Sequence, residues 1–554
     1  MKNRIIFLND IFDVKNNTMV PKYQFVDTDK KKNLLETSKQ SGETKYTPWS
    51  RYIGPYLVAQ SIEDNLPEWE VVIIDYFTKI NNFSKYIRSF INEDTKYIAI
   101  SSTFLHNPFS HRLNLFNLWC LTHEDICKWF EELKLVAPHV EFIIGGGIID
   151  TIYKTHIVEK TKKPLPEVLS KYFSYAFHGY GEDVIVDFLK DEVSKENIFE
   201  KEGVIFINEP KLASSGAKVI RMKWNAQHSV QEGEWLPLEI SKGCRFGCKF
   251  CFYDTHGTII KEKNILRDEF LRNYEHYGVQ GYAFIDDTIN DSITKIDMLY
   301  DVITNLPFKV EWISYARPDM FHKYSEMYFK MKDMGCRGMF FGVESLNHEA
   351  GKIAGKGLHP DKIKEILRWT KEESGNELFH LGSFIIGLPG ETEESLMKTA
   401  QWLCDQRCLD KAQYEILFVS DNSNNRTNNV FSARNNIFGF EKVTWNPEYY
   451  WKHKTLDSTQ CKRIASQWEA IMENHPTTVL ERHANFNTSF WAYPRMRSFG
   501  LDHYQAVSVS LKGKLSDDIH KRNMEWIKTF HDRIQKINHV SSDHRRQRVV
   551  LARH

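Results

Sequence analysis

The chain has 554 residues, of which 42% are hydrophobic and 13% aromatic, enough for several buried cores. A chain of this length is expected to form three or four structural units. Lys+Arg and Asp+Glu both number 73, so no overall basic field favours a nucleic-acid partner. No apolar run approaches the roughly 18 residues of a membrane-spanning helix, and none is expected.

Nine cysteines, an odd number with three close together, indicate a reducing compartment rather than a disulfide framework, and we expect a cytoplasmic protein. The other cysteines are expected to be small buried apolar residues. Cys404 and Cys408, four apart on a predicted helix, leave a second metal site open as an alternative. The segment Met1–Asp10 has a short apolar run that fits a first β-strand better than a signal peptide.

The N-terminal third alternates short apolar runs with helical stretches, which predicts an open parallel α/β sheet. The predicted strands are 4–8, 71–75, 97–101 and 140–144, with a helix over 53–63. Residues 10–50 are polar and predict a long irregular insertion. We assign residues 1–195 to this Rossmann-like domain and 196–233 to a connector containing a short strand at 203–208.

Ligands of such sheets bind at the carboxyl ends of the strands. Here those ends carry small residues and glycines that let a bulky ligand approach the backbone. The arrangement resembles the cobalamin-binding domain that precedes the radical S-adenosylmethionine (SAM) barrel in one branch of that superfamily. The resemblance implies cobalamin contacts from Ser101, Thr103, Gly145, Gly146, Gly179, Gly181 and Glu182.

One departure concerns the lower cobalt ligand. This third contains no Asp-x-His-x-x-Gly sequence, which donates a histidine to cobalt in many cobalamin proteins. Members of the radical branch often lack it too. A domain that keeps the fold without the ligand remains the alternative.

The run Ser241-Lys-Gly-Cys-Arg-Phe-Gly-Cys-Lys-Phe-Cys-Phe252 has C-x3-C-x2-C spacing. Three thiolates, Cys244, Cys248 and Cys251, can hold three irons of a [4Fe–4S] cluster and leave the fourth open. The alternative is zinc, which would want a fourth Cys or His at its own spacing. The run resembles the cluster motif of the radical SAM superfamily, in which an aromatic residue such as Phe250 precedes the last cysteine.

Strand-and-helix units follow in the order of an incomplete (βα)6 barrel, which we place at 234–425. The predicted strands are 234–240, 281–288, 310–317, 338–345, 380–387 and 413–420, with a helix over 327–334. The order Asp-Asp, Arg-x-Asp, Gly-x-Glu-Ser and Gly-Leu-Pro-Gly-Glu resembles the radical branch that includes methylthiotransferases.

By that resemblance, polar residues at the strand ends bind SAM. Asp286 and Asp287 are candidates for its amino group and Arg317 for its carboxylate. Glu344 and Ser345 are candidates for its ribose or methionine atoms, and the backbone near Phe250 for adenine.

Each of these residues has a structural alternative. Asp286 or Asp287 fits a helix cap, and Arg317 an ion pair with Asp319. Pro389-Gly390-Glu391 fits a turn into a helix that starts at Thr392.

Residues 426–554 are assigned to a mostly helical C-terminal domain, after an Asn-rich stretch at 421–429. Aromatic residues at 445–451 either line a substrate pocket or pack this region onto the barrel. The basic stretch His544–Arg548 is expected to be solvated, with nucleic-acid contact a minority interpretation.

The resemblance implies an enzyme whose reduced cluster cleaves SAM to methionine and a 5′-deoxyadenosyl radical, which abstracts hydrogen from an unactivated carbon. Methyl transfer through cobalamin is the outcome we predict, with a flavodoxin or ferredoxin as reductant. Cyclisation, rearrangement or oxidation without methyl transfer is the alternative, and a non-catalytic iron–sulfur or cobalamin-binding sensor is an alternative of another class. The sequence does not name the substrate.

Overall fold

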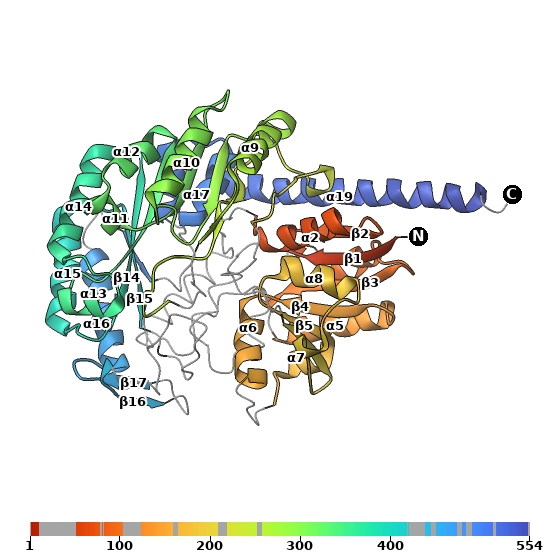
Figure 1. Cartoon of the computed structure of the whole chain (residues 1–554), viewed down its shortest axis with the longest axis horizontal. Coiled ribbons are helices and arrows are strands. Elements are labelled where there is room, and N and C mark those ends of the chain that lie inside the picture. Colours follow the sequence, from red (N-terminus) through yellow and green to blue (C-terminus); the bar gives the residue numbers. More distant parts are fainter. Residues whose placement is uncertain are drawn as a thin grey trace.

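A computed structural model describes residues 2–9, 51–77, 80, 82–102, 123–158, 164–208, 219–251, 258–417, 419, 438–444, 450–473, 479–482, 490–512 and 517–551. They form two main sheets of seven strands each (Figure 1). The predicted insertion at 10–50, the Asn-rich stretch and Thr103 lie outside the described residues.

The N-terminal sheet has the strand order β2-β1-β3-β4-β5-β7-β6. All neighbouring pairs are parallel except β6–β7. Its strands are β1 Asn3–Leu8, β2 Trp69–Ile74, β3 Thr95–Ser101, β4 Glu141–Gly145, β5 Phe173–His178, β6 Ile198–Lys201 and β7 Val204–Asn208. The four strands predicted in this third are therefore confirmed as β1 to β4. The predicted connector strand is β7, and it belongs to this sheet.

Helices cover both faces of the sheet because successive strand residues point to opposite sides. In β1, Ile5 and Phe7 join one buried layer, whereas Ile6 and Leu8 join the other. The helices are α2 Gly54–Asn65, α3 Phe83–Arg88, α5 His123–Val136, α6 Gly147–Tyr153, α7 Glu167–Tyr172 and α8 Gly181–Leu189, with a π-helix η5 at Lys154–Val158 and 3-10 turns η6 Lys195–Asn197 and η7 Ala226–His228.

The second sheet is the barrel, with the strand order β8-β11-β12-β13-β14-β15-β18 and parallel pairing throughout. Its strands are β8 Leu236–Glu239, β11 Gly281–Ile285, β12 Glu311–Ala316, β13 Cys336–Glu344, β14 Phe379–Ile386, β15 Lys411–Ile416 and β18 Val479–Arg482. A small hairpin, β9 Ser241–Lys242 with β10 Ile259–Ile260, follows β8. A second hairpin pairs β16 Phe440–Thr444 with β17 Tyr450–His453.

A layer of helices covers the outside of the barrel (Figure 1). They are α9 Lys263–Tyr277, α10 Ile293–Thr304, α11 Pro318–Lys323, α12 Glu326–Asp333, α13 His348–Ala354, α14 Pro360–Ser374, α15 Glu393–Gln406 and α16 Ser458–Glu473. The predicted start of α15 is confirmed, since Thr392 and Ser395 form a capping box.

The barrel has one strand more than the six expected. β18 pairs in parallel with β15, and it comes from a region assigned to a helical domain. Its four residues, Val479-Leu-Glu-Arg482, include only two apolar side chains. So short a segment carries no periodic signal that distinguishes a strand.

The C-terminal segment packs on both units. The 3-10 turn η10 (Phe490–Ala492) and α17 (Tyr493–Ser498) pack on barrel side chains such as Ile313 and Phe340. After α18 (His503–Lys512), the long helix α19 (Asp517–Leu551) runs beside the N-terminal unit and on past it to the C-terminus (Figure 1). No helix among the described residues is long and apolar enough to cross a membrane.

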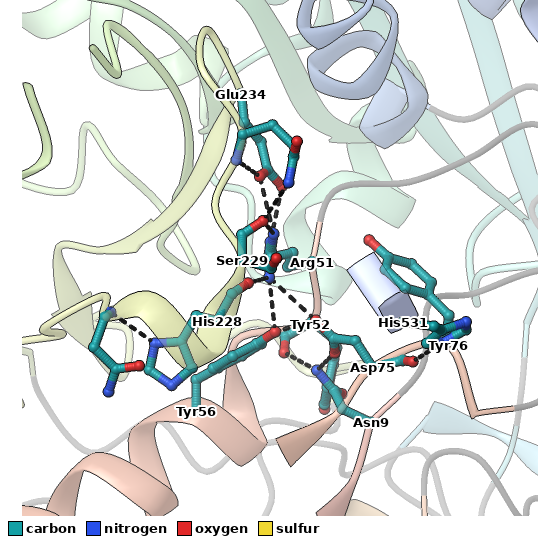
Figure 2. Close-up of polar contacts among 12 residues, drawn as sticks. Asn9, Arg51, Tyr52, Tyr56, Asp75, Tyr76, His228, Ser229, Glu234 and His531 are labelled. Atoms are coloured by element: carbon teal, nitrogen blue, oxygen red, sulfur yellow. Dashed lines mark hydrogen bonds and ion pairs between the residues drawn. The ribbon is translucent and has the colours of Figure 1, made fainter. Parts of the chain in front are cut away.

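A buried arginine ties the two units together. The Arg51 guanidinium donates to both carboxylate oxygens of Glu234, just before β8, at 2.8 and 2.9 Å. It also donates to Asp75, after β2, at 3.3 Å and to the hydroxyl of Tyr56 at 3.0 Å. Figure 2 shows Arg51 between Glu234 and the pair of Tyr56 and Asp75. The neighbouring carboxylates raise the pKa of Arg51 against the opposing effect of burial, so it stays charged.

Candidate active site

The three motif cysteines lie on the loop after β9, at the carboxyl end of the barrel. Cys248 is buried, while Cys244 and Cys251 are half-buried. The loop is anchored to two barrel strands. The Cys244 sulfur lies 3.6 Å from the hydroxyl of Thr288, after β11, and an Arg317 N–H donates to the Cys248 sulfur at 3.2 Å, after β12.

A third anchor comes from α13. The Lys249 amide donates to the carbonyl of Ala354 at 3.0 Å. Beside it, Gly355 has a φ of +85°, and a Cβ there would lie 3.3 Å from the carbonyl of Gly247. The loop therefore packs closely over the ends of three successive barrel units.

The donor chemistry of this loop fits an iron–sulfur cluster. All three cysteines are free of disulfide bonds, and the Cys248 sulfur already accepts a charged hydrogen bond, as a thiolate ligand would. Across the part of the chain that the structure describes, no three His, Cys, Asp or Glu side chains are arranged as a metal site. The ligand role of the three thiols therefore stays a prediction.

Of the two aspartates after β11, Asp286 is held by other side chains. Lys295 of α10 donates to both of its oxygens at 3.1 Å, and Ser241 donates at 2.7 Å. Both Asp286 and Lys295 are fully buried. This internal ion pair holds Asp286 in place, and its contact with the amino group of SAM stays a prediction.

Asp287 has no such partner within the described part of the chain, and it keeps contact with solvent. Desolvation in the barrel and the adjacent charge of Asp286 raise the pKa of Asp287 to about 6, although Lys295 acts in the opposite direction. A carboxylate that is exposed at a strand end and raised in pKa is a functional candidate.

Arg317 forms the ion pair that was its structural alternative. Its guanidinium donates to both oxygens of Asp319 at 2.9 and 2.7 Å and lies 4.0 Å from the ring centre of Phe246. Its remaining nitrogen contacts Cys248, as described above. Arg317 thus supports the cysteine loop, and its predicted contact with the SAM carboxylate stays a prediction.

Glu344 ends β13 in a backbone conformation that is unusual for its side chain. Its φ is 68°, in the left-handed region that favours glycine. Lys356 lies 3.4 Å from its carboxylate and donates to the carbonyl of Gly342 at 2.8 Å. Lys356 also lies 5.7 Å from the ring centre of Phe250, which is half-buried on the cysteine loop. The structure thus brings the predicted Glu344 and Phe250 together through a lysine.

Ser345, after β13, contacts the Gly-Leu-Pro-Gly-Glu turn that follows β14. Its hydroxyl donates to Glu391, the last residue of Gly-Leu-Pro-Gly-Glu, and accepts from the Asn347 amide at 3.0 Å. Burial raises the pKa of Glu391, against hydrogen bonds from Ser345 and Ser395. The serine and glutamate therefore brace two strand ends against each other, and the SAM contact of Ser345 stays a prediction.

At the N-terminal sheet, Gly146 follows β4 with a φ of +98°. A Cβ at Gly146 would lie 2.8 Å from the hydroxyl of Ser101 and 3.0 Å from that of Ser102. The Ser102 hydroxyl is buried and has no hydrogen-bond partner among the residues that the structure describes. Strand β1 lies between β2 and β3, so the strand order reverses between β1 and β3. Ser101 ends β3 at this point, and ligands of such sheets usually bind at the carboxyl ends of the strands there.

The Gly179–Glu182 element lies at the same edge. The Gly179 amide donates to Asp150 at 3.0 Å, and Gly181 begins α8 with Val58 against it. Glu182 forms a 2.9 Å ion pair with Lys242, two residues before Cys244. Glu182 thus connects this edge to the cysteine loop, and its contact with cobalamin stays a prediction.

Three lysines of the site, Lys242, Lys295 and Lys356, were not predicted as site residues. Each pairs with a carboxylate far away in the sequence or on another element. Only Lys295 had a signal in the sequence that could have indicated its role. It lies among the apolar residues of α10, where a lysine needs a buried partner, and it is fully buried.

Comparisons with known proteins agree with this geometry. Residues 238–403 match the model of the radical SAM superfamily. An uncharacterized methyltransferase of Pyrococcus horikoshii is 29% identical over 180 residues, 32% of this chain and 38% of that protein. Bacteriochlorophyllide d C-12(1)-methyltransferase of Chlorobaculum tepidum is 24% identical over 188 residues, 33% of this chain and 40% of that protein. The matches thus span about two fifths of these relatives.

Solved structures match over more of the chain. The radical SAM methyltransferase TsrM of Kitasatospora setae, with cobalamin and a [4Fe–4S] cluster bound, has a TM-score of 0.54 and 12% identity, covering 98% of this chain and 100% of that one. The cobalamin-dependent radical enzyme OxsB has a TM-score of 0.51 and 13% identity over 98% of this chain and 81% of that one. These likenesses confirm the predicted combination of an α/β domain, a partial barrel and a helical C-terminal part. The radical SAM match thus extends from β8 to α15 of the barrel.

Proposed function

We propose that this protein is a cobalamin-dependent radical SAM enzyme that methylates an unactivated carbon. The radical SAM match, the two methyltransferase-named relatives and the fold shared with TsrM and OxsB support this proposal. The observation that carries it is the position of the cysteine loop. The loop lies on the barrel strand ends and, through Lys242, contacts the glycine-rich edge of the N-terminal sheet.

The site residues form three sets, one for the cluster, one for SAM and one for cobalamin. Cys244, Cys248 and Cys251 would hold the cluster, with Arg317 and Thr288 supporting two of the sulfurs. Asp287, Glu344, Lys356 and Phe250 would surround SAM. Ser101, Ser102, Gly145, Gly146 and Gly179 would face cobalamin. When bound, the cluster supplies the electron that cleaves SAM, and cobalamin supplies a carrier for the methyl group.

The protein's own contribution is orientation and exclusion of water. Charged partners fix the Asp286, Arg317 and Glu344 side chains, so the strand ends around SAM are held in place before it binds. A small electron-transfer protein such as a flavodoxin or ferredoxin would reduce the cluster.

The test is anaerobic purification with cluster reconstitution and added cobalamin, followed by iron, sulfide and cobalt counts. We expect about four irons per chain in the native protein and a loss of iron in Cys248→Ala. Cys408→Ala is the matched control, because Cys408 is a buried cysteine at the end of α15. Unchanged iron in all three loop variants would contradict the proposal.

Methyl-labelled SAM then distinguishes the reaction types. The proposal expects deoxyadenosine in the reduced enzyme and label transferred to the substrate when extracts of the source cells are supplied. Label that stays in methionine would indicate cyclisation, rearrangement or oxidation instead. An intact cluster that yields no deoxyadenosine would indicate a sensor.

A further inference from the structure

An ion pair between the two units lies directly beside the cysteine motif. The Lys242 ammonium, in β9, is 2.9 Å from a carboxylate oxygen of Glu182, in the first turn of α8. The two side chains are only 4% and 10% exposed. Lys242 also lies 4.9 Å from the ring centre of Tyr180. The pair is therefore shielded from solvent and belongs to both units.

Each partner is fixed on its own side. The Ser61 hydroxyl of α2 donates to the Glu182 carbonyl at 2.6 Å, which ties the start of α8 to α2. Lys242 is paired across the hairpin with Ile259. Two residues after Ile259, Lys261 forms a fully buried ion pair with Glu269, which holds the hairpin on its own unit. A shift of either unit would therefore have to break the Lys242–Glu182 contact.

A buried ion pair is poor evidence for stability, because apolar residues of similar volume often stabilise as much or more. Its geometric specificity is a better explanation here. Glu182 follows the glycines at the edge where cobalamin is proposed to bind, and Lys242 precedes Cys244 by two residues. This contact thus links the two proposed cofactor sites directly, in addition to the Arg51 contact farther away.

We propose that the Lys242–Glu182 pair is a positioning latch that holds the cysteine loop in register with the ligand-binding edge of the N-terminal sheet. This proposal rests on the proposed function for its purpose. The latch itself is a property of the protein without cofactors and is tested in that state.

The test is hydrogen–deuterium exchange of peptides covering residues 241–251 in the cofactor-free protein. We expect Glu182→Gln to speed exchange in these peptides by about tenfold or more, because a buried charged hydrogen bond is lost. Lys242→Met should produce a similar increase. The double variant should add nothing to either single change, since both remove the same contact.

Two variants separate a latch from general loosening. Lys242→Arg keeps a positive charge that can reach Glu182. Its exchange of residues 241–251 should therefore stay close to that of the native protein. Lys223→Met is the matched control, because Lys223 pairs with Asp64 at 2.5 Å between the connector and α2 but is about two fifths exposed. It should leave the exchange of 241–251 unchanged.

A spectroscopic measurement follows reconstitution. Glu182→Gln should alter the electron paramagnetic resonance line shape of the reduced cluster, and Lys223→Met should not. Native-like exchange of 241–251 in Glu182→Gln, or equal acceleration in Lys223→Met, would overturn the latch. Failure of the proposed function would instead appear as missing iron, cobalt or deoxyadenosine in the native protein, whatever the exchange result.

Discussion

Gly342 of β13 lies directly against the Glu344–Lys356 ion pair, where a larger side chain would collide with it. A Cβ there would lie 2.9 Å from a Glu344 carboxylate oxygen and 3.2 Å from the Lys356 ammonium. We predict that Gly342→Ala lowers the free energy of unfolding by about 1–3 kcal/mol, as overpacking does. It should also weaken SAM binding, because the carboxylate is displaced. Denaturant unfolding and calorimetric titration with SAM measure the two effects.

Gly351 provides the comparison for this substitution. It lies within α13, and a Cβ there meets nothing within 4 Å. Gly351→Ala should be neutral or stabilise by up to about 1 kcal/mol through helix propensity. Equal destabilisation by both alanines would show that space at Gly342 is not the cause.

The raised pKa of Glu239 should make the free energy of unfolding depend on pH. Burial, with the charges of Glu182 and Glu269 nearby, raises the pKa of Glu239 to about 8, against the influence of Lys242 and Lys261. An unfolded glutamate loses its proton at about pH 4.3. The folded chain therefore binds the extra proton between about pH 4 and 8, and this group makes the free energy of unfolding fall as pH rises through that window.

Glu239→Gln mimics the protonated side chain and should remove this contribution. Urea unfolding at pH 5 and pH 8 provides the measurement. We expect the variant to gain stability relative to the native protein as pH increases. Parallel pH profiles for the two proteins would contradict the assignment.

Among the elements, the short turn η10 packs a large aromatic side chain against the barrel strands. Phe490 is 1% exposed and lies with its ring centre 5.8 Å from that of Phe340 and 5.5 Å from that of Phe379. Phe490→Ala should cost about 3–5 kcal/mol of unfolding free energy. Tyr504→Ala, at a side chain that is 64% exposed, should change it by less than about 0.5 kcal/mol. Thermal or denaturant unfolding of the two variants compares them.

The elements themselves were largely predictable. Apolar runs such as Tyr97–Ser101 and His380–Gly387 became parallel strands with bounds shifted by a residue or two. Long buried strands have a strong signal because both of their faces are apolar. Short ones do not, which explains why β18 and β6 were not predicted.

The site was predictable in its residue types but less so in its contacts. The strand-end residues do gather around the cysteine loop, as their order implied. Whether Asp286 is free, however, depends on Lys295, and whether Arg317 is free depends on Asp319. Such pairings are set by how helices pack on the strands, and a single sequence contains no direct record of them.

At the scale of the molecule, Arg51 joins the N-terminal unit to the barrel. Its side chain is fully buried beside Asp75 and Glu234. Arg51→Met leaves these carboxylates partly unpaired and should cost about 3–5 kcal/mol. Because the contact crosses between the units, we also expect denaturant unfolding to separate into two transitions.

Arg4→Met provides the control for this experiment. Arg4 pairs with Glu70 at 2.9 Å, and both residues lie in the N-terminal sheet. Its loss should weaken that sheet without dividing the transition. A single, merely shifted transition in Arg51→Met would contradict the role given to Arg51.

The segment 490–551 also links the units, and it follows both sheets in the sequence. Ile527, Phe530 and Ile534 of α19 complete a buried layer of the N-terminal sheet, while Phe490 and Tyr493 complete the barrel. Chains fold as they leave the ribosome, beginning at the N-terminus. Both cores therefore stay incomplete until residues 490–534 have left the ribosome, however early their strands are made.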